Sequence, residues 1–311
     1  MSYTTDIFKV RSSDGLHELF GKVYCPDGDA KGFFQVVHGM AEHIDRYDAF
    51  MSKMASEGWI CFGYDHLGHG KTAVDDSELG FICKKGGADL LVRDVNVYSD
   101  AVIEKYGKQK GISAPYVLMG HSMGSFVVRL AAERFKKPDK LIAMGTAGKN
   151  PLATAGLALI GIIKFFCGKK HVSKFIDNMA FGAYNKRFGG GTPTDPSPWL
   201  TTDESIRNAY YADKYCGFKF TVSAMGDLIG MIKKCNSSKW YKNLKSDMPI
   251  LLVAGSEDPV GNYSEGVIEV RDGLAARGIP VECVIYDGAR HEILNDFVKE
   301  DVVRDILKFC N

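Results

Sequence analysis

The feature of this 311-residue chain that most limits its fold is a set of short, almost entirely apolar segments separated by amphipathic ones. The apolar segments lie at residues 33–37, 59–64, 116–119, 141–144, 250–254 and 281–286. Strands that are apolar on both faces suit a sheet that is covered on both faces, which is the usual setting of parallel strands. The pattern therefore predicts a central parallel sheet packed between helices.

Helices are predicted from apolar residues that recur at steps of three and four. Such stripes run through residues 88–106, 263–277 and 296–310. Strands that alternate with helices in this way indicate an α/β fold with a doubly wound sheet. Two further segments, 5–10 and 17–24, are expected to form an antiparallel hairpin at one edge of that sheet.

The alternation stops between residues 149 and 240. This stretch is helical and loop-like in composition and has no clean strand pattern. We interpret residues 149–240 as a helical cap inserted over the sheet, with residues 1–148 and 241–311 forming the core.

Charge and cysteine usage limit the partners and the compartment. The 39 basic and 38 acidic side chains leave a formal net charge of only +1, so a nucleic-acid partner is not expected. Residues 1–15 show no secretory signal pattern, and no apolar run reaches the ~18 residues of a membrane span. The eight cysteines include no C-x-x-C pair and favour free thiols over disulfides. We therefore expect a cytoplasmic protein.

The strongest chemical signal is the sequence YVLMGHSMG at residues 116–124. An apolar strand leads into G-x-S-x-G, and a helical pattern follows, which is the context of a nucleophile elbow. Glycines at 120 and 124 leave room for a turn too tight for side chains, and that turn exposes the hydroxyl of Ser122. An ordinary strand-to-helix turn is the alternative, but this context favours Ser122 as the nucleophile.

A serine nucleophile needs a base and a carboxylate that orients the base. His291 follows the apolar segment 281–286, and the neighbours Glu257 and Asp258 follow the segment 250–254. We prefer Asp258 as the acid because its shorter side chain stands beside Pro259, and Glu257 stays as the rival.

The sequence His38-Gly39-Met40 directly follows the segment 33–37. A glycine there lets the backbone turn, so that the N–H of Met40 can face a developing oxyanion. The N–H of Met123, the residue after the nucleophile, is the expected second donor.

Five sequence blocks, in this order, resemble those of monoacylglycerol lipases and of the related lysophospholipase-like serine hydrolases. The blocks are HGMAEHIDRY (38–47), GYDHLGHGKT (63–72), GHSMGS (120–125), GSEDPV (255–260) and GARHEILND (288–296). The resemblance implies an α/β-hydrolase fold with an eight-stranded, mostly parallel sheet and a cap. It also implies the nucleophile, acid, base and oxyanion donors already named: Ser122, Asp258, His291, Met40 and Met123.

The expected activity is that of a serine carboxylester hydrolase that forms an acyl-enzyme and needs no metal or organic cofactor. Single-chain lipid esters, such as monoacylglycerol or lysophospholipid, are the expected substrates, but the five blocks by themselves do not say which ester is cleaved. A general carboxylesterase, a thioesterase, an amidase or aminopeptidase, and acyl transfer to an alcohol all remain open on the same triad. A non-catalytic binding protein is disfavoured because all three triad residues are present.

The cap contains an uncharged run from Leu152 to Ile163, followed by two phenylalanines. This run either packs the cap onto the sheet or lines a substrate entrance. In the second case Leu159, Ile163 and Phe166 are the expected substrate-binding residues, and the same surface would make weak peripheral contact with a membrane.

Several other polar residues admit two interpretations. His66 and His69, with His38 and His43, have the residue type of zinc ligands, but a tight loop after a strand is the preferred interpretation. Glu42, Arg46 and Tyr47 either contact substrate or form a structural ion pair. All three residues closely follow Met40, the predicted oxyanion donor, in the sequence.

Overall fold

Eight strands form one sheet in the computed structural model, which describes residues 1–311. Their order across the sheet is β1-β2-β4-β3-β5-β6-β7-β8. The bounds are β1 Tyr3–Arg11, β2 Glu18–Pro26, β3 Gly32–Val37, β4 Trp59–Tyr64, β5 Tyr116–His121, β6 Lys140–Met144, β7 Ile250–Gly255 and β8 Val281–Tyr286. The pairs β1–β2 and β2–β4 are antiparallel, and every other pair is parallel. The predicted parallel centre and edge hairpin are confirmed.

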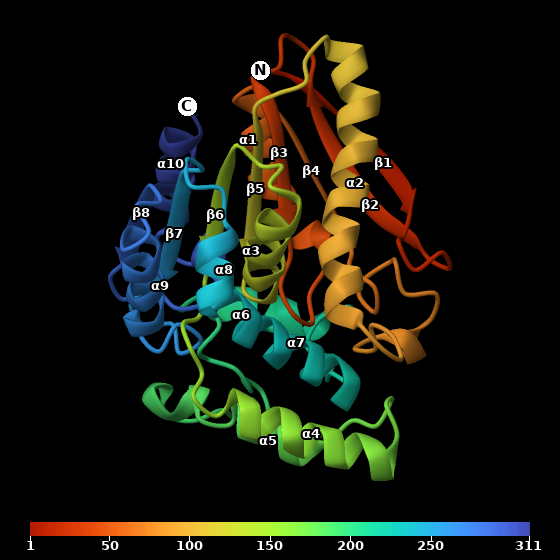
Figure 1. The fold of residues 1–311 in the computed structure, drawn as a ribbon, viewed down its shortest axis with the longest axis vertical. Helices are drawn as coiled ribbons and strands as arrows, with labels where there is room; N and C mark the ends of the chain where they lie inside the picture. The colour runs from red at the N-terminus through yellow and green to blue at the C-terminus, as the bar shows by residue number, and fades with distance from the viewer.

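The sheet is covered on both faces, as its apolar strands require. In β3, Phe33 and Val37 point into one hydrophobic core and Phe34 and Val36 into another, because successive side chains alternate between faces. The first core is completed by α2 (Gly87–Lys110), α3 (Met123–Phe135) and α9 (Glu265–Ala275), and the second by α1 (Asp48–Ser56) and α10 (Lys299–Cys310). Figure 1 shows the helices on either side of the strands.

The last strand differs from the expectation in its exposure. Residues 281–286 were predicted as a buried strand, but most of β8 is only half-buried. The reason is its position, because β8 is an edge strand that pairs with β7 alone.

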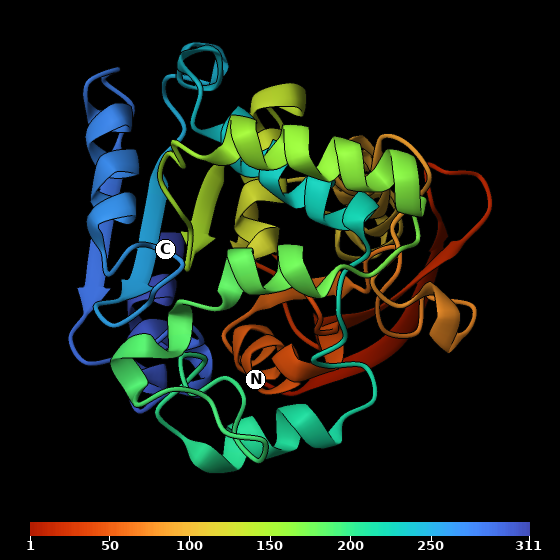
Figure 2. The ribbon, with the colours of Figure 1, turned by 90° about the horizontal axis from the view of Figure 1, so that it is seen from below.

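Between β6 and β7 the chain leaves the sheet and forms helices without any strand. These are α4 (Ala153–Cys167), α5 (Lys174–Phe181), α6 (Glu204–Ala212), α7 (Val222–Cys235) and the short α8 (Ser238–Asn243). Figures 1 and 2 show that α4 to α7 gather at one end of the sheet, whereas both chain termini lie at the other. Buried residues of these helices, including Ile160, Met225 and Met231, belong to the same core as the sheet.

Four short 3₁₀ helices complete the secondary structure. They are η1 (Ile44–Tyr47), η2 (Asp76–Glu78), η3 (Tyr184–Phe188) and η4 (Ile293–Asn295). All eight cysteines are free thiols. None of the helices combines the length and the apolar character that crossing a membrane requires.

One buried arginine joins the two points where the inserted helices connect to the core. Arg129 on α3 is 1% exposed and lies over the ring of Trp240, 4.4 Å from the ring centre. Its Nη1 donates to Thr146 Oγ1 and its Nη2 to Asn236 Oδ1, at 3.1 and 2.9 Å. Nη2 also donates to the carbonyl oxygen of Cys235 at 2.6 Å. The side chain therefore links the segment after β6 to the end of α7.

We predict that Arg129→Met lowers the free energy of unfolding by about 3 kcal/mol, because it leaves several buried acceptors without a donor. Chemical denaturation measures this loss. The control is Arg134→Met on the same helix, where the arginine side chain is 43% exposed and a change below about 0.5 kcal/mol is expected. Equal losses in the two variants would contradict the role of Arg129.

Candidate active site

Ser122 lies at a strained turn between β5 and α3. Its φ of +52° falls in the left-handed region that non-glycine residues rarely adopt. Its N–H donates to the carbonyl oxygen of Met144 at 2.9 Å. A Cβ on Gly120 would overlap the carbonyl oxygen of Gly124, and a Cβ on Gly124 would overlap that of Val37. Both glycines therefore have the steric role predicted from the motif.

The ends of β7 and β8 bring an acid and a histidine together. Asp258 is fully buried, and its Oδ2 lies 2.9 Å from Nδ1 of His291. Its other oxygen accepts the N–H of Val260 at 2.8 Å, which fixes the carboxylate. Glu257, by contrast, points outward and forms a 3.7 Å ion pair with Arg187. The geometry thus brings Asp258 rather than Glu257 to the imidazole, and it leaves Nε2 of His291 as the free ring nitrogen.

Two backbone N–H groups near Ser122 have no acceptor within the protein, and they belong to Met40 and Met123. Met123 is the first residue of α3, where helix N–H groups lack an intrahelical partner. The neighbouring N–H of Gly39 is used, because it donates to Glu42 Oε1 at 2.6 Å. The N–H groups of Met40 and Met123 are thus unpaired, and both residues line the same cavity as Ser122.

These groups open into one cavity of about 640 Å³, a size typical of small-molecule sites. Ser122 and His291 line it from the carboxyl ends of the strands. The inserted segment supplies much of the rest of the wall: Phe181, Tyr184, Trp199, Tyr210, Phe218, Leu228 and Ile232. Ser122 therefore lies in a pocket that is largely apolar on the side of the insertion.

The three substrate-binding residues expected from the sequence lie elsewhere. Leu159 and Ile163 of α4 are half-buried against the core, and Phe166 is 78% exposed on the outer surface. None of them lines the cavity, because α4 lies outside α7. The apolar wall comes instead from residues such as Leu228 and Ile232 of α7. Their spacing of four residues predicts a helical face, but sequence alone does not say what that face covers.

The loop that carries His291 is attached to the inserted segment. The N–H of His291 donates to the carbonyl oxygen of Trp199 at 3.4 Å, and the N–H of Glu292 donates to the carbonyl oxygen of Leu200 at 2.7 Å. The rings of Trp199 and His291 lie 5.1 Å apart between centres. The insertion therefore helps to hold the histidine as well as to line the cavity.

The loop after β3 is attached to the insertion in the same way. The carbonyl oxygen of Ala41 accepts two hydrogen bonds, from Tyr210 Oη at 2.9 Å and from the N–H of Gly217 at 3.0 Å. Ala41 has a φ of +53°, so this loop is strained and is held by contacts from outside it.

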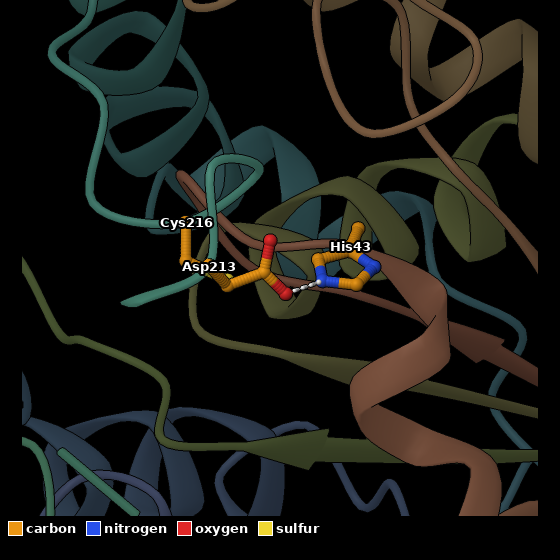
Figure 3. A group of neighbouring side chains, drawn as sticks. All are labelled: His43, Asp213 and Cys216. Atoms are coloured by element: carbon orange, nitrogen blue, oxygen red, sulfur yellow. Dashed lines mark hydrogen bonds and ion pairs between the residues drawn. The ribbon is translucent and has the colours of Figure 1, made fainter. Parts of the chain in front are cut away.

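Next to this contact, His43, Asp213 and Cys216 form the cluster shown in Figure 3. Their ligand atoms lie within 4.8 Å of one another, which is close enough to share a metal ion. However, His43 Nε2 is already hydrogen-bonded to Asp213 Oδ2 at 2.8 Å, and burial raises the pKa of the Cys216 thiol. Metals bind the thiolate, so a protonated Cys216 is a poor ligand. The contact between His43 and Asp213 thus serves as a link between the loop and the insertion.

The other histidines considered as metal ligands form a buried cluster beneath the same loop. His66 and His69 lie in the loop after β4, with their ring centres 4.4 and 5.3 Å from that of His38. Burial lowers the pKa of His38 to about 3 and that of His69 to about 4, so both rings are neutral. His38 Nε2 accepts the N–H of His66 at 3.0 Å, and Nδ1 lies 2.8 Å from the carbonyl oxygen of Gly39. His38 therefore ties the loop after β3 to the loop after β4.

Comparison with known proteins places this geometry in a family. The model of the family described as serine aminopeptidase, S33, matches residues 28–297. A monoacylglycerol lipase of Mycolicibacterium smegmatis is 24% identical over 91% of this chain and 89% of its own length. A monoglyceride lipase homolog of monkeypox virus is 28% identical over 93% of this chain and 92% of its own.

A solved structure is similar over nearly the whole chain. It is that of a highly thermostable carboxyl esterase from Bacillus coagulans in complex with glycerol. The two superpose with a TM-score of 0.90 at 28% identity, covering 99% of this chain and 98% of that one.

The reactivity of Ser122 tests the site directly. A fluorophosphonate should label the protein and should fail to label Ser122→Ala. Asp258→Asn should slow labelling by about 10³–10⁴-fold, because only the group bonded to Nδ1 of His291 fixes the imidazole tautomer. Glu257→Gln is the matched control and should stay within twofold. A larger loss from Glu257→Gln than from Asp258→Asn would reverse the assignment.

Proposed function

Because this chain belongs to the serine aminopeptidase S33 family of the α/β-hydrolase superfamily and is a serine ester hydrolase, we propose that it cleaves single-chain lipid esters such as monoacylglycerol or lysophospholipid. The observation that carries the proposal is the cavity of about 640 Å³, which joins Ser122 to apolar side chains of α5 and α7. The lipase names of two relatives that align over most of the chain support the same substrate class.

In the proposed mechanism, Ser122 Oγ attacks the ester carbonyl carbon while His291 Nε2 accepts the hydroxyl proton. Asp258 holds the imidazole orientation through Nδ1 and stabilises the imidazolium. The N–H groups of Met40 and Met123 donate to the tetrahedral oxyanion. His291 then protonates the leaving alcohol, and water cleaves the acyl-enzyme by the same route.

We propose that residues 149–240 act as the cap of this enzyme and residues 1–148 and 241–311 as its catalytic core. The support is that the inserted segment both lines the cavity and holds the loops that carry His291 and Met40. We retain the cytoplasmic location expected from the sequence as part of the proposal.

An aminopeptidase or amidase is the second candidate, because of the family's description. Recognition of a peptide amino terminus calls for a carboxylate free to bind the ammonium group. The cavity has three lining carboxylates: Glu42 and Glu292 are paired with Arg46, and Asp177 is paired with Lys219. Because these carboxylates are already paired, the cavity favours a neutral ester, such as one with a glycerol leaving group, over a substrate with a charged amino terminus.

The acyl-chain profile tests the substrate class. For monoacylglycerols, kcat/KM should rise with acyl-chain length until the pocket is full, because each buried CH₂ stabilises the bound acyl chain by up to ~0.8 kcal/mol. Long-chain esters should then have a kcat/KM about a hundredfold higher than that of acetate esters. Ile232→Trp, which narrows the pocket, should shift the preference to shorter chains. Aminoacyl nitroanilides should react poorly. A flat profile in the parent enzyme would remove the lipid substrate while leaving the esterase intact.

We also propose that the cap makes weak peripheral contact with a membrane. Large apolar side chains are exposed along α4 and α5: Ile162, Phe165, Phe166, Phe175 and Met179. Basic residues stand among them: Lys164, Lys169, Lys170 and Lys174. An apolar surface with basic side chains at its margin suits the boundary between headgroups and acyl chains.

Vesicle binding tests the contact. The double variant Phe165→Ser, Phe166→Ser should lower partitioning into phosphatidylcholine vesicles by about a hundredfold, since burying one phenylalanine contributes ~1.5–3 kcal/mol. Cosedimentation measures it. Leu16→Ser, which changes an equally exposed apolar residue in the turn between β1 and β2, is the control and should bind as the parent does. Equal binding by the double variant and the parent would contradict the contact.

A further inference from the structure

The loop after β3 sits on a buried charge cluster that the mechanism above does not use. Arg46 Nη1 donates to Glu42 Oε2 at 2.6 Å, and its two terminal nitrogens donate to the two oxygens of Glu292 at 2.8 and 2.6 Å. Both carboxylates are at least 95% buried. Of the two interpretations of Glu42 and Arg46 left open by the sequence, the structure thus shows the ion pair.

Glu42 differs from Glu292 in the contacts of its second carboxylate oxygen, Oε1. Glu42 Oε1 accepts the N–H of Gly39 at 2.6 Å and the hydroxyl of Tyr47 at 2.9 Å. A Cβ on Gly39 would lie 2.6 Å from this oxygen and 3.1 Å from Cβ of Ser122. The backbone of Gly39 is therefore held between the carboxylate and the nucleophile, and the next N–H along the chain is the proposed oxyanion donor.

The charge of Glu42 is maintained by its neighbours. Burial alone would raise the pKa of Glu42, but the hydrogen bond with His121 and the ion pair with Arg46 hold that pKa well below its ordinary value. Burial opposes protonation of His121, yet the Glu42 carboxylate raises the pKa of this histidine above its usual value. His121 Nδ1 lies 2.9 Å from Tyr47 Oη and 3.3 Å from Glu42 Oε1, and its Nε2 lies 3.3 Å from the carbonyl oxygen of His291.

Each carboxylate of the cluster has an ion-pair partner and a further hydrogen-bond donor. The guanidinium of Arg46 is paired with both carboxylates, and the ring of His121 lies against Glu42. A buried set of charges is tolerated only when it is paired in this way. The carboxylate of Glu42 is therefore a fixed acceptor within a loop that is strained at Ala41.

We propose that Glu42 is a positioning residue for ester hydrolysis, which by accepting the N–H of Gly39 orients the adjoining peptide so that the N–H of Met40 faces the oxyanion formed at Ser122. The inference rests on the proposed function, because it assumes the roles of Met40 and Ser122 given there. Glu42 acts on the transition state and not on substrate binding, so its loss should lower kcat while leaving KM little changed.

The test uses Glu42→Asp, which keeps a carboxylate beside Arg46 but is one methylene too short to reach Gly39. Glu42→Gln removes the charge and is the second variant. With a medium-chain p-nitrophenyl ester, Glu42→Asp should lower kcat by about a hundredfold, with KM within twofold. Glu42→Gln should lower kcat less, because its amide oxygen can still accept the N–H of Gly39. Glu57→Asp makes the same change in an exposed carboxylate paired with Lys53, and it should leave both constants unchanged.

Two inhibitors separate positioning from a general loss of structure. An alkyl trifluoromethyl ketone carries an oxyanion once the serine has added to it, whereas an alkyl glyceryl ether of equal chain length has no carbonyl. Glu42→Asp should weaken binding of the ketone by about the same factor as kcat and should leave binding of the ether within twofold. Equal weakening of the two ligands, or an unchanged kcat in Glu42→Asp, would overturn the inference.

The same experiment distinguishes failure of the inference from failure of the proposed function. A parent enzyme that hydrolyses no carboxylester, or a Ser122→Ala variant that keeps its turnover, would overturn the proposed function. An active parent whose Glu42 variants match it would overturn only the role of Glu42.

Discussion

The close approach of β3, β5 and α3 around Ser122 is the constraint on which the rest of the site depends. Glycines at 120 and 124 let the chain turn with a φ of +52° at the serine, a strain that costs about 1–3 kcal/mol. Because no side chain stands between α3 and the end of β3, the loop that begins at His38 lies directly against Ser122. The two unused N–H groups, of Met40 and Met123, are a consequence of this packing.

The inserted helices complete the site as well as cover it. Trp199 and Leu200 bind the backbone of the loop that carries His291, and Tyr210 and Gly217 bind the carbonyl of Ala41. The segment that supplies the apolar wall thus also fixes the two loops on which the proposed chemistry depends. A displacement of residues 199–217 would therefore change the geometry of the reacting groups together with the shape of the cavity.

The buried charged side chains beside the cavity are paired with one another. Arg46 lies between Glu42 and Glu292, and His121 Nδ1 lies 3.3 Å from Glu42 Oε1. Removing one member leaves its partner buried and unpaired, which costs several kcal/mol, so the cluster tolerates few substitutions. The arrangement also leaves neither Glu42 nor Glu292, which both line the cavity, as an unpaired carboxylate.

The sequence by itself determined what depends on short-range pattern: the strands, the glycine-flanked serine, and the placement of Asp258 and His291 after strands. Parallel strands bring their carboxyl ends to one edge, so residues at those ends were predictably neighbours. Only the tertiary structure decided that Asp258 and not Glu257 meets the imidazole, that Glu42 shares Arg46 with Glu292, and that α7 rather than α4 lines the pocket. The reason is physical: a helical or strand period tells which face of an element is apolar, but the partner of that face is set by packing between segments far apart in the chain.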